Sequence, residues 1–309
     1  MQPFVLSEQT YAAIRQTKWE AAVLPFGATE PHNLHMPYGT DNYQVDEIGR
    51  RACTFAWDRG ARVLLLPTIP FGVNTNHLKV PSGMAISLMP TTLLKILGDI
   101  CESLEASGVR KLMLLNGHGG NELKPFMREL HNRTSVFLCL CDWFRLASDE
   151  VSKICENPGE HADELETSLG MAFFPQFLDK PIPGSGVARP VRFEAVRKGW
   201  ISITRPWHLL TADTGVGDPG QSSADKGRAI MQVLEQRIGS FLVELARSEL
   251  DASFPYCWER GRPRPPWRGG EDARAPGIPP LRICFPAREK VFYPSFRSSD
   301  RPPWKCAAG

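Results

Sequence analysis

Apolar and polar positions alternate along the first half of the chain so that short buried segments are separated by longer amphipathic ones. Four apolar runs predict strands that lead into loops, at residues 20–27, 61–72, 109–121 and 134–144. Three amphipathic segments between them predict helices, at residues 41–60, 89–108 and 122–133. Strands that alternate with helices are typical of α/β proteins, so we expect a three-layer α/β/α sandwich around a parallel or mixed sheet.

The second half of the chain is less regular. Two more helices are predicted, one over residues 162–174 and a long one that ends near residue 250. Residues 254–309 hold eleven of the 27 prolines, and eleven Lys or Arg against five Asp or Glu. This composition is typical of irregular or disordered chain. We therefore expect one domain over residues 1–250 and a Pro/Arg-rich extension over residues 251–309.

Composition excludes several classes of protein. The 42% hydrophobic and 23% charged fractions are ordinary for a globular chain of 309 residues. No apolar run of about 18 residues occurs, and the N-terminus lacks the pattern of a signal peptide, so no membrane partner is expected. The eight cysteines form no C-x-x-C pair, which favours reduced thiols and a cytoplasmic location. Outside residues 254–309, 25 basic residues face 29 acidic ones, which argues against a nucleic-acid partner.

The loop after the first predicted strand concentrates metal-binding groups. It reads GATEPHNLHMPYGTD, residues 27–41, and contains Glu30, His32 and Asp41. Its prolines and Gly39 prevent a regular helix. In an extended segment the side chains of Glu30 and His32 point the same way, and a carboxylate beside an imidazole suits Zn²⁺ or Mn²⁺. The alternative is a solvated loop that carries polar groups.

Two other segments carry candidate ligands. The glycine-rich stretch NGHGGN, residues 116–121, places His118 at the end of the third predicted strand. It is compatible with a ligand site, a phosphate-binding loop or a tight turn. The stretch HADELETS, residues 161–168, puts Asp163 and Glu166 three positions apart on a predicted helix, where acidic residues also suit the helix dipole. Because ligands bind at the carboxyl ends of parallel strands, we expect the loops after the first, third and fourth strands to meet at one sheet edge.

Taken together, these stretches resemble the creatininase (creatinine amidohydrolase) family. The family's motifs occur in the family's order as GATEPHNLHMPYGTD, NGHGGN, HADELETS and TGVGDP. The resemblance covers roughly residues 18 to 245. It implies a hydrolase with two divalent metal ions, Zn²⁺ or Mn²⁺ with Fe²⁺ as a further candidate, and a homo-oligomer, often a hexamer.

The resemblance also assigns roles to individual residues. It implies that Glu30 and His118 hold one metal ion, that His32 and Glu166 hold the other, and that Asp41 bridges both. His161 matches the family's general acid/base. A supporting role or a place in the substrate pocket is expected for four further residues: His35, Trp143, Asn116 and Asn121.

Departures from the family's pattern bear on the substrate. The chain has Pro31-His32-Asn33 where the family usually has Gln-His-Gly, and Gly120 where creatininase proper has a metal-site glutamate. We therefore expect hydrolysis of a carbon–nitrogen bond in a small, cyclic amide or related metabolite other than creatinine. The alternatives are a carbon–carbon bond of a cyclic diketone of the keto-inositol type, a formamide or a peptide bond. A non-catalytic metabolite-binding protein is a third hypothesis.

Overall fold

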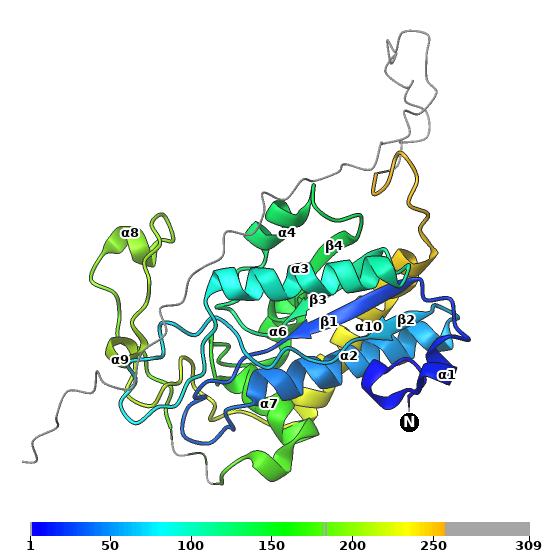
Figure 1. The fold of residues 1–309 in the computed structure, drawn as a ribbon. Helices are drawn as coiled ribbons and strands as arrows, with labels where there is room; N and C mark the ends of the chain where they lie inside the picture. Colours follow the sequence, from blue (N-terminus) through cyan, green and yellow to red (C-terminus); the bar gives the residue numbers. More distant parts are fainter. Residues whose placement is uncertain (1, 181, 183, 257–309) are drawn as a thin grey trace, which may run out of the picture. The chain divides into compact units, whose positions relative to one another are not determined.

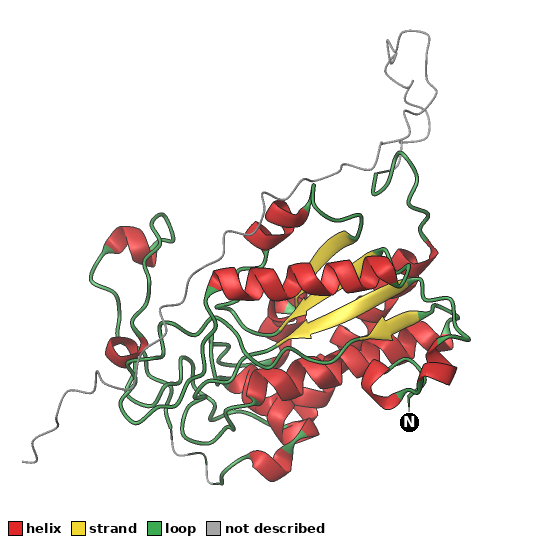
Figure 2. Ribbon diagram, in the orientation of Figure 1, coloured by secondary structure: helices red, strands yellow, loops and turns green. Residues whose placement is uncertain are grey.

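Four parallel strands form the centre of the protein in the computed structural model, which describes residues 2–180, 182 and 184–256. The strand order is β2-β1-β3-β4; the strands are yellow in Figure 2 and labelled in Figure 1. Their bounds are β1 Ala21–Phe26, β2 Val63–Leu65, β3 Lys111–Asn116 and β4 Phe137–Asp142. Each strand lies inside one of the four predicted apolar runs. The sheet is parallel throughout, which resolves the prediction of a parallel or mixed sheet.

Helices cover both faces of this sheet (Figure 1). On one face, α3 and α4 pack against alternate residues of β1 and β3, including Leu24 and Leu114, to form a large apolar core. On the other face, α2 and α10 pack against each other and against β1. The three-layer α/β/α sandwich is therefore confirmed. The helical bounds are η1 Leu6–Glu8, α1 Tyr11–Ile14, α2 Thr40–Asp58, α3 Pro90–Ala106, α4 Lys124–Leu130, α5 Trp143–Leu146, α6 Ser148–Ile154, α7 Glu164–Phe173, η2 Pro175–Phe177, α8 Glu194–Arg197, α9 Trp207–Leu210 and α10 Ala224–Arg247.

The carboxyl ends of three strands are in register. Phe26 pairs with Asn116, and Asn116 pairs with Asp142. The segments that follow β1, β3 and β4 therefore begin side by side at one edge of the sheet. This is the edge at which ligands bind in open parallel sheets.

A close contact between α7 and α10 fixes the helix that carries Glu166. A Cβ atom on Gly227 would lie 2.0 Å from the carbonyl oxygen of Ser168, so only glycine lets the two helices approach this closely. The N-cap Ser223 of α10 accepts a hydrogen bond from the backbone N–H of Lys226, which fixes where that helix begins.

A buried lysine joins the beginning of β3 to the end of α10. The Nζ atom of Lys111 donates hydrogen bonds to the carbonyl groups of Leu245, Ala246 and Ser248 at 2.7, 2.8 and 2.9 Å. These carbonyl groups are the ones that the last turn of a helix leaves without partners, and a cation there also suits the helix dipole. Burial lowers the pKa of Lys111.

Residues Met1–Glu249 form one compact unit. No helix in the described part of the chain is both long and apolar enough to cross a membrane. The described cysteines are all free: Cys53, Cys101, Cys139, Cys141 and Cys155. The extension predicted over residues 251–309 lies outside the described residues beyond position 256, and its irregular structure stays a prediction.

Candidate metal centre

The loop between β1 and α2 brings three predicted ligands to the carboxyl edge of the sheet. Glu30 and His32 follow β1, and Asp41 lies in the first turn of α2. The chain turns back between them, because the backbone N–H of Glu30 donates to the carbonyl of Tyr38 at 3.1 Å. All three ligand side chains are buried. A helix could not bring residues so spaced to one point, which explains the irregular sequence of this loop.

His118 and Glu166 complete the group from distant parts of the chain. The Nδ1 atom of His118 lies 2.9 Å from Oε1 of Glu30 and 3.3 Å from Oδ2 of Asp41. The Nε2 atom of His32 lies 3.1 Å from Oδ1 of Asp41 and 3.9 Å from Oε2 of Glu166. Asp41 thus faces both halves of the group. The five predicted ligands gather in one place, as two sets that share this carboxylate.

Backbone carbonyls orient the two histidines toward the centre of the group. The Nδ1 atom of His32 lies 3.0 Å from the carbonyl oxygen of Glu30, and Nε2 of His118 lies 3.3 Å from that of Val73. Each carbonyl accepts a hydrogen bond from one ring nitrogen, which leaves the other nitrogen to face the carboxylates. Histidines that ligate metal ions are held in this way.

Buried carboxylate oxygens that face imidazole nitrogens form a group that fits a metal ion. Both Oε atoms of Glu30 and Oδ2 of Asp41 are buried and accept no hydrogen bond of normal geometry from the described residues. Burial opposes the charge on Glu30, but the nearby charge of His118 holds its pKa at about 2, so it is ionised. Ionised, buried oxygens beside imidazole nitrogens form a ligand set for Zn²⁺ or Mn²⁺. The donor atoms of Glu30, Asp41 and His118 lie within 4.8 Å of one another.

Protons occupy the ligand set in the metal-free protein. Burial opposes the charge on His32, but Asp41, Glu166 and Glu30 raise its pKa to about 10. The pKa of His118 is likewise raised well above its usual value against the effect of burial, mainly by Glu30. Burial raises the pKa of Glu166 to about 8. All three groups therefore hold a proton at neutral pH and must release it to bind a metal ion.

Metal affinity is therefore expected to rise with pH. Between pH 6 and 8, each proton displaced from His32, His118 or Glu166 raises the apparent affinity by about tenfold per pH unit. Titration calorimetry with Zn²⁺ in buffers of different ionisation enthalpy measures the number of protons released. An affinity that is independent of pH over this range would contradict the protonation states assigned here.

His161 lies beside this group with one ring nitrogen directed toward it. Its Nε2–H donates to the carbonyl of Pro31 at 2.9 Å, and its Nδ1 lies 3.7 Å from Oε1 of Glu30. Burial, with the nearby charge of His32, lowers the pKa of His161 to about 3, so Nδ1 carries no proton at neutral pH. Such a nitrogen can accept a proton or bind a metal ion. The role of His161 as general acid/base stays a prediction.

The backbone next to His161 is strained. Ala162 has a φ of +49°, in the left-handed region that a residue with a Cβ atom seldom adopts. In this conformation the backbone N–H of Ala162 donates a hydrogen bond to Oε2 of Glu166 at 2.6 Å. Asp163 then serves as the N-cap of α7, where its side chain accepts a hydrogen bond from the N–H of Glu166. Asp163 therefore stabilises the beginning of α7, in line with the alternative that acidic residues here serve the helix terminus. Glu166 is free to face the other predicted metal ligands.

The side chains of Asn116 and Asn121 stabilise the glycine-rich turn, residues 116–121, through hydrogen bonds to backbone groups. The side-chain amide of Asn116 donates to the carbonyl of His118 at 3.0 Å and accepts from its N–H at 3.2 Å. Asn121 donates to the carbonyl of Gly27 at 3.1 Å and accepts from the N–H of Val73 at 3.0 Å. Asn116 therefore fixes the turn that carries His118, and Asn121 connects this turn to the segments that follow β1 and β2.

His35 anchors the ligand-bearing helix rather than joining the ligand set. Its Nε2 lies 2.9 Å from Oγ1 of Thr167, the residue after Glu166 on α7. Burial, and after it the charge of His32, lowers the pKa of His35 to about 4. A neutral His35 therefore packs under the site and helps to hold α7 in place.

Two residues at the site, His77 and Trp207, carried no predicted role. The Nδ1 atom of His77 lies 3.1 Å from Oε2 of Glu30, the oxygen that faces away from His118. The rings of His77 and Trp207 pack with centroids 4.4 Å apart, and Trp207 also meets His161 edge-on at 5.2 Å. His77 lies on the loop that follows β2. In the sequence, the one sign that His77 could belong to the site was its place in a Gly/Asn/Pro-rich loop that follows a predicted strand.

Gly120 leaves no space for the glutamate of creatininase proper. A Cβ atom at this position would lie 2.4 Å from Nε2 of His118 and 2.5 Å from the carbonyl oxygen of Val73. The segment that contains Val73 and His77 fills this side of the site instead. The metal environment therefore differs from the one that the creatininase pattern implies.

Replacing His77 with leucine is expected to weaken metal binding by about 10- to 100-fold, because Glu30 loses the partner that orients its carboxylate. Competition with a chromogenic chelator measures the affinity, and the melting temperature of the metal-free protein reports the fold. His131→Leu, at an exposed position after α4, is the matched control. Equal affinities in the two variants would contradict a positioning role for His77.

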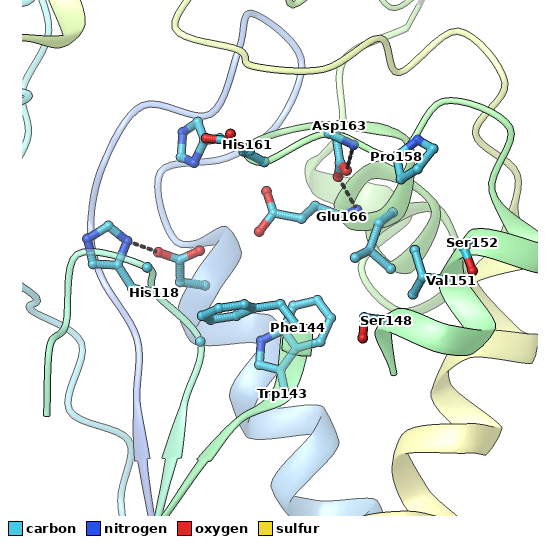
Figure 3. A pocket seen from close by; sticks show the side chains of 16 residues that line it. His118, Trp143, Phe144, Ser148, Val151, Ser152, Pro158, His161, Asp163 and Glu166 are labelled. Carbon is cyan, nitrogen blue, oxygen red and sulfur yellow. Dashed lines mark hydrogen bonds and ion pairs between the residues drawn. The ribbon is translucent and has the colours of Figure 1, made fainter. Parts of the chain in front are cut away.

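Two cavities border the group of ligands. One, of about 260 Å³, extends from Asp41, His118 and Glu166 toward α6 (Figure 3). Trp143, which is fully buried, and Phe144 lie on one side of it, and Pro158 and Asp163 lie on the other. The second, of about 710 Å³, extends from Glu30 and His118 past His77 and Trp207. Trp143 thus lines a cavity at the site as predicted, whereas Asn116 and Asn121 line neither of these two.

The fold and the site define a class of protein: a parallel α/β protein with ligands for two divalent metal ions at the carboxyl edge of its sheet. Residues 6–242 match the sequence model of the creatininase family, which is described as creatinine amidohydrolase. The protein belongs to the creatininase family. The resemblance noted in the sequence is thereby confirmed, and members of this family are hydrolases.

Known relatives differ in what they act on. The chain is 27% identical over 222 residues to the mycofactocin precursor peptide peptidase of Mycobacterium ulcerans, covering 69% of this chain and 80% of that protein. It is 25% identical over 174 residues to the 3-dehydro-scyllo-inosose hydrolase of Thermotoga maritima, covering 53% of each. The structure of a candidate creatinine amidohydrolase from Bacteroides fragilis is 32% identical, with a TM-score of 0.76 over 81% of this chain and all of that one. A Mn creatininase structure at 21% identity shares the fold, with a TM-score of 0.60 over 80% of this chain and all of that one.

Proposed function

We propose that this protein is a dinuclear-metal-dependent hydrolase that cleaves the carbon–nitrogen bond of an amide other than creatinine. The observation that carries the proposal is the group formed by Glu30, Asp41 and His118, in which buried carboxylate oxygens face one imidazole nitrogen at 2.9 and 3.3 Å. Creatininase structures have been described in Mn and Zn–Zn forms, which supports the choice of metals. The lack of space at Gly120 supports a substrate other than creatinine.

The side chains around the ligand group have separate tasks in this reaction. Glu30 and His118 would hold one ion, His32 and Glu166 the other, and Asp41 both. Two bound divalent ions supply Lewis acidity that lowers the pKa of water and polarises a carbonyl group. His161 offers an unprotonated Nδ1 that faces the same space, so it can take a proton from the attacking water and return it to the departing nitrogen.

A carbon–carbon bond is the main rival. The relative from Thermotoga maritima acts on 3-dehydro-scyllo-inosose, and the fold and metal ligands do not dictate which group leaves. Protonation distinguishes the two reactions: an amide nitrogen requires a proton donor to depart, whereas a carbon leaving group requires stabilisation as an enolate. His161 suits the first requirement, which favours carbon–nitrogen hydrolysis.

The test combines metal analysis with a substrate panel. Purified protein is stripped with a chelator, reloaded with Zn²⁺ or Mn²⁺, and assayed against cyclic amides, formamides, peptides and keto-inositols. Two ions per chain and metal-dependent release of an amine are expected. Turnover of keto-inositols alone would replace the proposal with its rival, and a fully loaded protein without any turnover would favour the non-catalytic hypothesis. Gel filtration of the same sample tests the predicted homo-oligomer.

A further inference from the structure

The motif TGVGDP, residues 214–219, supplies none of the five predicted metal ligands, but its backbone is bonded to that of His161. The N–H groups of Glu160 and His161 donate to the carbonyl of Val216 at 2.7 and 3.1 Å, and the N–H of Val216 donates to the carbonyl of His161 at 2.8 Å. These hydrogen bonds fix the main chain at His161. They leave the orientation of its imidazole ring to side-chain contacts.

Trp207 connects this motif to the loop that carries His77. Its indole Nε1–H donates to the carbonyl of Thr214 at 3.0 Å, and its backbone N–H donates to the carbonyl of Asn76 at 3.1 Å. Trp207 is also buried. Its side chain is therefore anchored by one hydrogen bond from the ring and one from the backbone, and neither bond involves a predicted metal ligand.

The imidazole of His161 contacts the rings of His32 and Trp207. Its centroid lies 4.1 Å from that of His32, at an interplanar angle of 31°, and 5.2 Å from that of Trp207, at 81°. Trp207 also packs against His77, with centroids 4.4 Å apart. The one hydrogen bond from Nε2 of His161 to the carbonyl of Pro31, at 2.9 Å, cannot by itself fix the plane of the ring. The nearly perpendicular contact with Trp207 restricts rotation, because the indole fills space beside the imidazole.

The orientation of the His161 imidazole decides what its Nδ1 atom can reach. This nitrogen lies 3.7 Å from Oε1 of Glu30 and faces the ligand group. A general base acts only within hydrogen-bond reach of its proton, and a misplacement of about 1 Å can lower a rate by about 100-fold. Trp207 cannot transfer the proton itself, because the single polar atom of its indole is a donor that is bonded to Thr214.

We infer that Trp207, anchored on the motif TGVGDP, is a positioning residue that holds the His161 imidazole in the orientation required for proton transfer. This inference rests on the proposed function and adds a residue to it. The rival explanation is contact with the substrate, because Trp207 also lines the cavity of about 710 Å³. The two roles differ in what they affect: a positioning residue acts on kcat through His161, whereas a cavity wall that binds substrate acts on KM.

Two substitutions of Trp207 separate these roles. Trp207→Leu removes the ring and its Nε1–H, whereas Trp207→Phe keeps an aromatic ring and loses the hydrogen bond to Thr214. Trp200→Leu is the matched control, because Trp200 is 75% exposed and lies between α8 and α9, outside the lining of this cavity. Each variant is also combined with His161→Ala. Steady-state kinetics on an amide that the wild type hydrolyses, metal content and melting temperature are measured for every protein.

The expected loss is confined to kcat and depends on His161. Trp207→Leu should lower kcat by about 10- to 100-fold. Trp207→Phe should lower it by about 2- to 10-fold, the effect of one hydrogen bond. KM and metal content should change little in both variants, and Trp200→Leu should behave as the wild type.

The background without His161 gives the sharper comparison. On the residual activity of His161→Ala, Trp207→Leu should cause no further loss, because its effect passes through the imidazole that is missing. An unchanged kcat, a change in KM alone, or an equal loss in both backgrounds would overturn the inference and leave the proposed function in place.

Nuclear magnetic resonance of the imidazole nitrogens tests the inference without turnover. In the wild type Nε2 of His161 carries the proton that is donated to Pro31, so its two nitrogens should give the distinct signals of one tautomer. These signals are identified by their absence from His161→Ala and are recorded for metal-free and Zn²⁺-loaded protein. Trp207→Leu should show a mixture of tautomers. Trp207→Phe should show the same to a smaller extent, which provides the test if the leucine variant does not fold.

The spectra also separate the failure of this inference from that of the proposed function. A single tautomer of His161 in every variant of Trp207 would overturn the inference, whatever the activity. A wild type without carbon–nitrogen turnover would remove the proposed function, and the spectra would still decide whether Trp207 orients His161.

Discussion

Replacing Asp41 with alanine is expected to abolish binding of both metal ions and to lower hydrolytic activity by about a thousandfold or more. The two oxygens of Asp41 face different histidines, with Oδ1 3.1 Å from Nε2 of His32 and Oδ2 3.3 Å from Nδ1 of His118. Removing this carboxylate therefore breaks both ligand sets at once. Elemental analysis of purified protein should fall from two ions per chain to none, and His118→Ala should give the same loss.

The fold should survive this change. Asp41 lies in the first turn of α2, where a carboxylate contributes only about 0.3–1 kcal/mol through the helix dipole. His32 and His118 can lose their protons when the charge beside them is removed. Asp58→Ala, at the exposed far end of the same helix, is the control and should keep both ions. Two ions retained in the Asp41→Ala protein would exclude the bridging assignment.

Replacing His161 with alanine is expected to lower kcat by about 10²- to 10⁴-fold, the usual contribution of a positioned acid or base. The metal content and KM should change little. The reason is geometric: Nε2 is committed to the carbonyl of Pro31, and Nδ1 faces the space beside Glu30 without a proton. Steady-state kinetics on a turned-over amide, together with metal analysis of the same sample, measures both quantities.

Metal content decides between two roles for His161. Its ring nitrogens lie within 4.8 Å of donor atoms of His32 and Glu166, and also of Glu30 and His77, so binding a metal ion is the competing role. Loss of one ion in His161→Ala would assign it to the ligand set. Retention of both ions with a lower kcat would assign it to proton transfer.

The sequence allowed much of the site to be predicted because most of its parts are set locally. Glu30, His32 and Asp41 lie within twelve positions, on a loop whose prolines exclude a helix. The strands of a parallel sheet are buried on both faces, so β1 and β3 appear as continuous apolar runs, and the edge at which they end follows from the fold class. The position of His118 at that edge therefore required only the assignment of one strand.

Other parts of the site depend on packing between loops, which periodicity does not encode. His77 reaches Glu30 because the loop after β2 is held by the segment around α9, where the N–H of Trp207 donates to the carbonyl of Asn76 at 3.1 Å. Neither segment forms a strand or a long helix. Within residues 61–72, where a strand leading into a loop was predicted, the strand is the short segment Val63–Leu65 and the chain then leaves the sheet to form this loop. The larger cavity is lined by these same two segments, so periodicity did not indicate it.

The hydrogen bonds of Lys111 limit how far the protein can be truncated from its C-terminus and how early it can fold during synthesis. The carbonyl groups that its ammonium needs are 134 to 137 positions further along the chain. A fragment that stops after residue 249 retains them, but one that stops before residue 245 leaves a charged group buried without acceptors at the root of the strand that delivers His118. On the ribosome, we therefore expect the ligand group to reach its final arrangement only after the end of α10 has emerged.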